Sequence, residues 1–366
     1  MRGRYRVTFV TISPSPYQRD LFAALSTRDD LELKVHYMEA AWPDFPWPDA
    51  PLQLRPFERV IPGFSIPLRV ARIHINWSLP DFRSGDVVVL SSFTSWTGQW
   101  LMRHGLRAQR WLFWGERLRK QPNRSREIVQ RTLIAPLSNA SGVVGIGRAA
   151  ELDYANRFPQ TRHFCIPYHC DLKGFLDAKR ESSSRPMTFL FCGRMIRRKG
   201  VDLLLHAFER LVAKKLDVTL RLVGREADLP EFLAGISQAA RTRICYEGIQ
   251  PPERLPEYFA RSDIFVLPSR HDGWGVVVNQ ALGAGLPVIT SDAVGAGIDL
   301  VEDGVNGLKF GAGDVDALER TMELLATNPR LAQEWGNASR QKALAITPQA
   351  GAQKWIQVLE SIASDT

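Results

Sequence analysis

The sequence alternates short runs of apolar, often β-branched residues with longer amphipathic stretches, and this pattern occurs twice. Strands that alternate with helices predict a parallel sheet covered by helices on both faces. The expected strands lie at 6–12, 31–37, 86–91, 111–114, 142–146 and 163–167 in the first half, and at 188–192, 219–223, 244–246, 264–267 and 287–290 in the second. The pattern therefore predicts two doubly wound α/β domains, a number that also suits a chain of 366 residues.

A polar, serine-rich segment divides the two patterns. Residues 177–186 end in proline and are the best candidate for a linker. We therefore expect a first domain over 1–176, a second over 187–347, and an amphipathic C-terminal helix over 348–366. The segment 42–67 contains seven prolines, and we expect it to be a long loop. That loop is either held to the domain surface by its own aromatic rings or serves as a ligand-binding flap.

The basic charge of the chain is concentrated in its first half. The net charge is +8, yet residues 1–183 carry 26 Lys and Arg against 17 Asp and Glu. Nine basic residues lie from Arg103 to Arg131, opposed only by Glu116 and Glu127. This run is either a solvated face or a patch that docks on anionic lipid or on a lipid-diphosphate. A nucleic-acid partner is not expected, because the sequence contains no recognition motif for one.

Neither a membrane span nor a metal site is predicted. No stretch approaches the roughly 18 apolar residues that a spanning helix needs. The four cysteines form no CxxC pair and no histidine lies at metal-finger spacing, so we expect reduced thiols in a cytoplasmic protein. If the basic run binds lipid, the protein is peripheral on the inner face of the membrane.

Two segments of the second half carry the strongest chemical signals. The first, FCGRMIRRKG at 191–200, directly follows an expected strand and places Gly193 and Arg194 at the carboxyl edge of the sheet, with Lys199 in the same loop. An arginine fork and a lysine point charge close together suit a diphosphate, although an ordinary solvated basic loop gives the same pattern.

The second segment, at 264–290, reads strand, loop, helix and strand. Its loop contains Asp272, and two glycines there allow a close approach of the backbone to a ligand. We expect a helix to start near Gly275, where its free N–H groups would bind an anion, and to stop at Gly285. Asp272 is either a ligand-binding carboxylate or a helix cap, and Gln280 lies about one turn inside the helix.

Together with LVEDGVNGLKFGAGDVDAL at 300–318, these segments resemble the retaining nucleotide-sugar glycosyltransferases of the GT-B fold, glycosyltransferase family 4. The resemblance covers about residues 186–325. It implies two Rossmann-like domains facing across a cleft, with the nucleotide-sugar donor mainly on the second and the acceptor on the first. It also implies that the C-terminal helix over 348–366 packs back toward the first domain and that the nucleotide-sugar is a substrate, with no cofactor. With Arg194, Lys199 and a helix terminus available, we expect that no metal ion is needed for the leaving group.

The resemblance assigns roles residue by residue. Arg194 and Lys199 match the basic pair that holds the donor diphosphate, and Asp272 matches the carboxylate that contacts the transferred sugar. Gln280 matches the residue that holds the ribose hydroxyls. At positions 272 and 280 the family has Glu, so this chain departs from the pattern at both. The remaining donor-binding positions implied by the resemblance are Gly193, Gly248, Ile249, Gln250, Gly273, Trp274, Gly275 and Val276.

On the acceptor side, Glu116 follows the strand at 111–114, where family members often carry a histidine beside the reacting sugar. Its carboxylate is either an acceptor of the hydroxyl proton or a partner for Arg117 or Arg119. Four hydroxyl-bearing residues after other strands are expected to face the cleft: Ser15, Tyr17, Ser92 and Thr94. Asp314 belongs to a DVD sequence that looks like a metal-binding motif, but its position predicts a helix N-cap.

The resemblance implies transfer of a sugar from a nucleotide-diphosphate sugar to a hydroxyl acceptor with retained configuration. The basic first half fits the assembly of surface polysaccharide or of a lipid-linked glycan. Two alternatives remain open, a non-catalytic protein that binds sugar nucleotides or polysaccharide and a sugar-nucleotide epimerase of the same fold.

Overall fold

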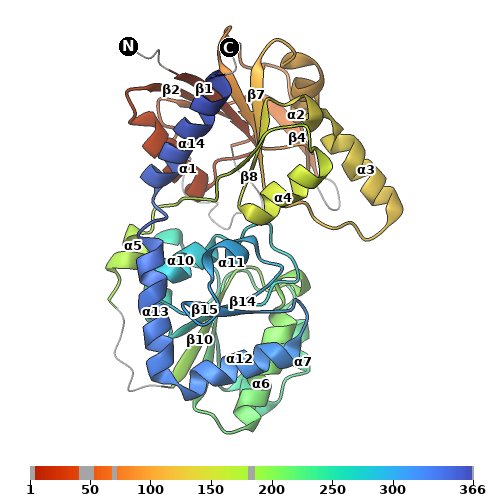
Figure 1. The fold of residues 1–366 in the computed structure, drawn as a ribbon. Helices are drawn as coiled ribbons and strands as arrows, with labels where there is room; N and C mark the ends of the chain where they lie inside the picture. Colours follow the sequence, from red (N-terminus) through yellow and green to blue (C-terminus); the bar gives the residue numbers. More distant parts are fainter. Residues whose placement is uncertain (1–4, 41–52, 68–71, 180–185, 365–366) are drawn as a thin grey trace. The chain divides into compact units, whose positions relative to one another are not determined.

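A computed structural model describes the chain except for residues 1–4, 41–52, 68–71, 180–185 and 365–366. The chain forms two compact units, Met1–Cys170 with Pro348–Thr366, and Asp171–Thr347 (Figure 1). The first boundary lies at Cys170, earlier than the expected position 176, because helix α5 (Lys173–Asp177) packs in the second unit, where Phe175 contacts Phe259. Most of the expected linker, 177–186, lies outside the described residues.

The described part of the first unit contains a parallel sheet with the strand order β3-β2-β1-β6-β7-β8-β9. Its strands are β1 (Tyr5–Thr11), β2 (Leu31–Tyr37), β3 (Glu58–Val60), β6 (Val87–Leu90), β7 (Arg110–Gly115), β8 (Gly142–Gly145) and β9 (His163–Cys165). Its helical elements are α1 (Pro16–Ser26), α2 (Trp96–Trp100), the π-helical turn η1 (Leu101–Gly105), α3 (Arg124–Ile134), the 3-10 turn η2 (Ala135–Asn139), α4 (Arg148–Arg157) and α14 (Pro348–Ala363).

The proline-rich segment 42–67 is not the single long loop that the sequence predicts. Its described part contains the edge strand β3 and the strand β4 (Gly63–Pro67), which pairs with β5 (Arg72–Asn76) in an antiparallel hairpin. Strands form here because β3 is an edge strand and the prolines stand outside it or at the end of β4, where they remove no central hydrogen bond. The part of this segment at 42–52 lies outside the described residues.

The second unit is built in the same way around a parallel sheet with the order β12-β11-β10-β13-β14-β15. Its strands are β10 (Met187–Cys192), β11 (Val218–Val223), β12 (Ile244–Tyr246), β13 (Ile264–Leu267), β14 (Val288–Ser291) and β15 (Gly307–Phe310). Its remaining helical elements are η3 (Arg197–Lys199), α6 (Val201–Ala213), α7 (Leu229–Ala234), α8 (Gln238–Arg241), η4 (Pro252–Arg254), α9 (Leu255–Ala260), α10 (Val277–Gly283), α11 (Gly295–Leu300), α12 (Val315–Thr327) and α13 (Pro329–Ala343).

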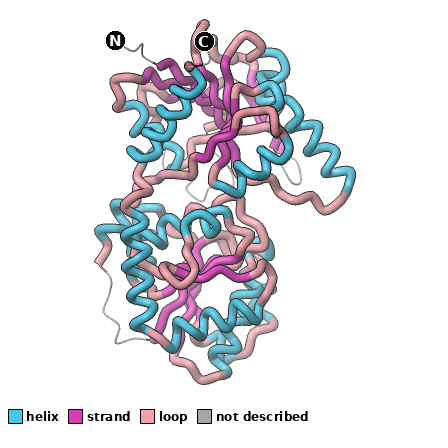
Figure 2. Tube along the Cα trace, in the orientation of Figure 1, coloured by secondary structure: helices cyan, strands magenta, loops and turns pink. Residues whose placement is uncertain are grey.

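Helices surround each sheet, and the predicted pair of doubly wound α/β units is confirmed (Figure 2). The central strands are apolar throughout because both faces are covered; every residue of β6 and β13 is buried. In the first sheet, the strands that follow β1 are added on one side of it up to β3 and then, from β6 on, on its other side. In the second sheet the same change of side occurs between β10 and β13. Such switch points leave a crevice at the carboxyl ends of the two strands, where open α/β sheets bind ligands.

The C-terminal helix α14 belongs to the first unit, where it lies against α1 (Figure 1). Its Trp355 is completely buried, with ring centroids 5.0 Å from Phe9 and 5.5 Å from Trp114. The last turns of the chain therefore complete the core behind β1 and β7. No helix among the described residues is both long enough and apolar enough to cross a membrane.

Candidate functional site

In the second unit, an ion pair stands at the switch point of the sheet. Lys199 ends the turn η3 that follows β10, and Asp272 lies in the loop that follows β13. Although 73 positions separate them in sequence, the Lys199 Nζ donates a hydrogen bond to Asp272 Oδ2. The two side chains are 17% and 11% exposed, so the pair is mostly withdrawn from water but still reachable by a ligand.

Several contacts lock the two loops that carry this pair. Arg270 forms a bidentate ion pair with Asp202, at 2.6 and 2.8 Å, and its backbone N–H donates to the Arg198 carbonyl oxygen. The Arg198 guanidinium donates to the His271 carbonyl oxygen at 2.9 Å. Gly200 takes φ +73°, and a Cβ atom there would overlap the Pro268 carbonyl oxygen. The lysine and the aspartate are thus held by a rigid base, as a preorganised site requires.

Asp272 is further fixed from its own side. Its backbone N–H donates to the Ala293 carbonyl oxygen at 3.0 Å, and Ser269 Oγ lies 3.5 Å from its Oδ2. Cys192, at the end of β10, is buried next to this group. Burial raises the pKa of the Cys192 thiol to about 12, against the opposing effect of the Lys199 charge. The thiol is therefore neutral and unreactive. The charged groups beside it that can act on a ligand are the side chains of Lys199 and Asp272.

The helix after the Asp272 loop begins near Gly275, as expected. Its first residue is Val277 and its cap is Val276, because Gly275 has a φ of +92° that lies outside the helical region. Asp272 is consequently not its cap. Gly285, with φ +69°, follows the end of this helix as predicted.

The Trp274 side chain packs inside the second unit. Its indole is buried, at 1% exposure, and its Nε1 donates to Asn279 Oδ1 at 3.0 Å. The Trp274 carbonyl oxygen accepts from Ala296 N of α11. The ring of Trp274 therefore shapes the loop that carries Asp272.

The other donor-side residues lie around the same carboxyl edge. Gly193 and half-buried Arg194 directly follow β10, and Gly248, Ile249 and Gln250 follow β12. Gln280 lies inside α10, and its side-chain Oε1 is buried with no hydrogen-bond partner among the described residues. An unpaired buried acceptor of this kind is available to a hydroxyl donor of a ligand.

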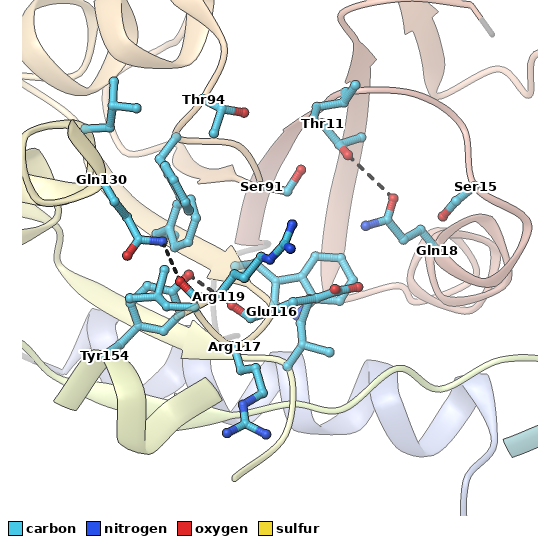
Figure 3. A pocket seen from close by; sticks show the side chains of 18 of the residues that line it. Thr11, Ser15, Gln18, Ser91, Thr94, Glu116, Arg117, Arg119, Gln130 and Tyr154 are labelled. Atoms are coloured by element: carbon cyan, nitrogen blue, oxygen red, sulfur yellow. Dashed lines mark hydrogen bonds between the residues drawn. The ribbon is translucent and has the colours of Figure 1, made fainter. Parts of the chain in front are cut away.

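The first unit has a pocket of about 880 Å³ at its own switch point. Thr11, Ser91 and Gly115, at the carboxyl ends of β1, β6 and β7, line it together with Glu116. In Figure 3, Glu116 lies near the middle of the pocket, with Thr11 and Gln18 on one side of it and Gln130 and Tyr154 on the other. The sequence-predicted carboxylate thus lines this pocket, where Glu116 is exposed.

Tyr168 orients that carboxylate. Its hydroxyl donates to Glu116 Oε1 at 3.2 Å, while the Tyr154 hydroxyl donates to the Glu116 backbone oxygen at 3.1 Å. Burial, and then the nearby charge of Glu116, raise the pKa of Tyr168 well above its usual value, so it stays protonated and remains a donor. The chemistry that this arrangement allows is acceptance of a proton by Glu116, or orientation of a ligand hydroxyl.

Of the hydroxyl-bearing residues expected on the acceptor side, Ser15, Tyr17 and Thr94 line the pocket. Ser15 is the N-cap of α1 and Tyr17 lies in its first turn, whereas the sequence suggests a loop there. The helix starts this early because Pro16 fits the first helical position, where no N–H is needed. The Ser15 Oγ is buried and has no hydrogen-bond partner among the described residues. Ser92 is not among the lining residues, because its hydroxyl accepts from Ser95 N and shapes the turn before α2; Ser91 takes its place.

Sequence reasoning missed two of the polar groups in this pocket. Tyr168 follows the short strand β9, and the carboxyl-edge argument applied to that strand would have pointed to it. Gln18 lies in the first turns of α1, and its Oε1 is 3.5 Å from Thr11 Oγ1. Three arginines also line the pocket: Arg117 and Arg119, which the sequence offers as partners of Glu116, and Arg126, which belongs to the basic run.

Asp314 is the N-cap of α12, as predicted, since its Oδ1 accepts from Ala317 N at 2.9 Å. The DVD sequence is therefore explained by the start of a helix. The described residues contain no group of three or more histidine, cysteine, aspartate or glutamate side chains arranged to hold a metal ion.

Two doubly wound units in one chain, each with polar groups at its switch point, define the GT-B class of fold. Solved structures share it: sucrose-phosphate synthase from Thermosynechococcus elongatus has a TM-score of 0.75 and 19% identity, over 99% of this chain and 100% of that one. Alr3699/HepE from Anabaena, solved with UDP, has a TM-score of 0.71 and 16% identity, over 97% of this chain and 100% of that one.

Residues 173–342, which lie within the second unit, match the family model of the glycosyl transferases group 1. A similar curated relative is the GDP-mannose-dependent alpha-(1-6)-phosphatidylinositol monomannoside mannosyltransferase of Mycolicibacterium smegmatis, 32% identical over 41% of either chain. An uncharacterized glycosyltransferase of Haemophilus influenzae is 28% identical over 42% of this chain and 43% of its own length. The matched segment thus spans about two fifths of the length of these relatives.

Proposed function

We propose that this protein is a retaining glycosyltransferase that moves a sugar from a nucleotide-diphosphate sugar to a hydroxyl group of an acceptor, without a metal ion. The observation that carries the proposal is the Lys199–Asp272 ion pair at the switch point of the unit that matches the group 1 family model. The names of similar proteins support a nucleotide-sugar donor, since one relative is GDP-mannose-dependent and one structure of the same fold contains UDP.

The donor chemistry follows from the charges at the switch point. In the reaction the bond between the anomeric carbon and a diphosphate oxygen breaks, and the diphosphate leaves with the bonding electrons. An ammonium group has three N–H donors, so Lys199 can hold a phosphate oxygen while it still donates to Asp272. Lys199 and Arg194 then stabilise the negative charge that develops on the leaving group. Asp272 is left facing the sugar, and Gln280 Oε1 accepts from a ribose hydroxyl.

The acceptor oxygen forms the new bond to the anomeric carbon and loses its proton. We assign the pocket of the first unit to the acceptor, with Glu116 as the group that orients its hydroxyl or receives that proton. Aromatic rings, hydroxyl groups and three arginines line this pocket, which suits a glycan that carries an anionic group. The acceptor class that we propose is therefore a surface polysaccharide or lipid-linked glycan, assembled on the cytoplasmic face of the membrane.

Calorimetric titration of the full chain with UDP and with GDP, followed by transfer assays with the corresponding sugar nucleotides, tests the proposal. We expect one of the two nucleotides to bind and its sugar to appear on an added glycan acceptor. Binding without any turnover of donor would instead identify a non-catalytic sugar-nucleotide protein. Conversion of the donor sugar in the absence of acceptor would identify an epimerase, and no binding of either nucleotide would reject the donor site.

A further inference from the structure

We propose that the first unit docks on an anionic lipid bilayer through one defined face of α2, η1 and α3. We call this face the docking surface; its members are Trp96, Trp100, Arg103, Arg124, Ile128 and Arg131. The inference deepens the membrane part of the proposed function, on which it rests, because it names the residues that meet the lipid.

The apolar members of the docking surface are unusually exposed for their size. Trp96 is 61% exposed, Trp100 is 44% exposed, and Ile128 is 56% exposed. On α3 only Gln130 and Ile134 are buried, so most of this helix faces outward. Tryptophan is the side chain that proteins place at the level of lipid headgroups, where its ring is buried and its N–H remains hydrated. These side chains are therefore suited to insertion at a membrane interface.

The two helices form one continuous patch within the first unit. Arg103 Nη2 donates to the Thr132 carbonyl oxygen at 3.0 Å, and Gln99 Nε2 donates to the Leu133 carbonyl oxygen at 2.8 Å. These contacts tie the last turn of α3 to α2 and η1, and Figure 1 shows α3 at the edge of the first unit beside α2. An object that touches the exposed side chains of one helix is thus within reach of the other.

Charge determines which partner the docking surface fits. Three of the six members of the docking surface are arginines, Arg103, Arg124 and Arg131. The acidic residue of α3, Glu127, already pairs with Arg131 at 2.6 Å, so its charge is compensated. A positive face with exposed tryptophan and isoleucine complements anionic headgroups above a hydrocarbon layer.

The position of α3 connects this surface to the acceptor pocket. The same helix that exposes Ile128 contributes Ser125, Arg126 and Val129 to the pocket lining. A bilayer that contacts the docking surface would therefore lie beside the entrance of the pocket. This arrangement explains why a cavity for a sugar acceptor has both an apolar wall and arginines, since an acceptor anchored in lipid presents a phosphate next to its chain.

Sedimentation of the full chain with lipid vesicles, without donor or acceptor, tests the proposal. We expect the chain to bind vesicles that contain phosphatidylglycerol at least tenfold more strongly than vesicles of phosphatidylcholine alone, and to be released by salt. Arg124→Glu with Arg131→Glu should reduce binding at least tenfold. Lys34→Glu with Lys354→Glu, which makes the same charge change in the first unit away from α2 and α3, should leave most of it.

The apolar contribution is tested separately. Ile128→Ser should lower binding at least threefold, whereas Leu152→Ser on α4, with 60% exposure a matched residue, should not. An equal loss of vesicle binding in both charge-reversed double variants would show that the bilayer attracts the net charge of the chain without a defined docking surface, and would overturn the proposal. Self-association of the chain without vesicle binding would overturn it too. Titration of UDP and GDP in the absence of lipid reports on the donor site alone, so a failure of docking is distinguished from a failure of the transferase function.

Discussion

At the scale of single residues, the account depends on how charges are paired before any ligand arrives. Lys199 and Asp272 neutralise each other in a mostly buried position. Removing one member of such a pair leaves a charge uncompensated, so loss of Lys199 affects both ligand binding and the stability of the loop. In the first unit, Tyr168 orients Glu116, and substitution of Glu116 examines the function of this carboxylate.

Replacement of Glu116 by glutamine tests its proposed role in proton transfer. The amide oxygen can still accept from Tyr168, but it is a far weaker base, so we expect kcat for sugar transfer to fall at least about a hundredfold. The affinity for UDP or GDP and the thermal midpoint should stay close to those of the unchanged protein. A variant with normal kcat would exclude Glu116 as the base, and Tyr168→Phe should show a smaller loss of the same kind.

At the scale of secondary-structure elements, the site depends on two loops that pack against each other. The turn η3 and the loop after β13 meet where Gly200 contacts Pro268, and this contact positions Lys199 beside Asp272. Two separate requirements act on Gly200, its positive φ and the absence of space for a side chain. Gly304 has a positive φ but has space for a side chain, so a comparison with Gly304 tests the two requirements separately.

We expect Gly200→Ala to lower the free energy of unfolding of the second unit by more than about 2 kcal/mol, because strain and overlap add. Gly304 is the matched control, because its φ is +77° and a Cβ atom there would have no neighbour within 4 Å among the described residues. Gly304→Ala should cost only about 1 kcal/mol. Chemical denaturation of both variants measures the difference, and equal costs would show that the contact with Pro268 is not tight.

The packing of α14 on the first unit predicts a dependence of stability on pH. His169 packs against Gly351 of α14, and burial lowers the pKa of His169 to about 4 from an ordinary value of 6.5. Since the unfolded chain binds this proton more readily, stability should fall as the pH decreases from about 6.5 toward 4. At pH 5 the loss from His169 should be roughly 2 kcal/mol.

His169→Asn keeps a donor for the Pro167 carbonyl oxygen, which His169 Nδ1 approaches at 2.8 Å, but does not titrate. Denaturation of this variant at pH 7 and pH 5 should therefore show a smaller decrease than the unchanged protein. Part of the decrease should remain, because burial and the charges of Arg59 and Lys34 lower the pKa of His36 to about 4 as well. A decrease of the same size in the variant would contradict the explanation.

At the scale of the whole molecule, the sequence is sufficient to predict the two units and most of their strands. Buried parallel strands such as β10 and β13 are nearly continuous apolar runs, so they are visible without a structure. Four strands are not predicted by the pattern: β3, β4, β5 and β15. They have three to five residues each, and β3 and β15 are only partly buried, so their residues show no such run. The predicted domain boundary lies too late in the chain because the contact of Phe175 with Phe259 is long-range.

In the candidate site, too, local sequence position predicts some residues, and others depend on long-range packing. Lys199 and Asp272 could be predicted because the end of a parallel strand fixes where the next residues lie, and the structure brings them together. The buried indole of Trp274 could not, because its direction depends on Asn279 and on packing that only the folded chain provides. Tyr168 could have been predicted in the same way, because it directly follows the strand that the sequence indicates at 163–167.

The most direct test of the account is titration of UDP and GDP into the full chain and into three variants. If Lys199 and Arg194 hold the diphosphate, Lys199→Ala and Arg194→Ala should each weaken nucleotide binding at least tenfold, or about 1.4 kcal/mol. Lys214→Ala is the control. Lys214 is also ion-paired, to Glu319 and Glu323, but it is an exposed residue at the C-terminal end of α6. Unchanged affinity in both the Lys199 and Arg194 variants, or an equal loss in the Lys214 variant, would contradict the diphosphate site.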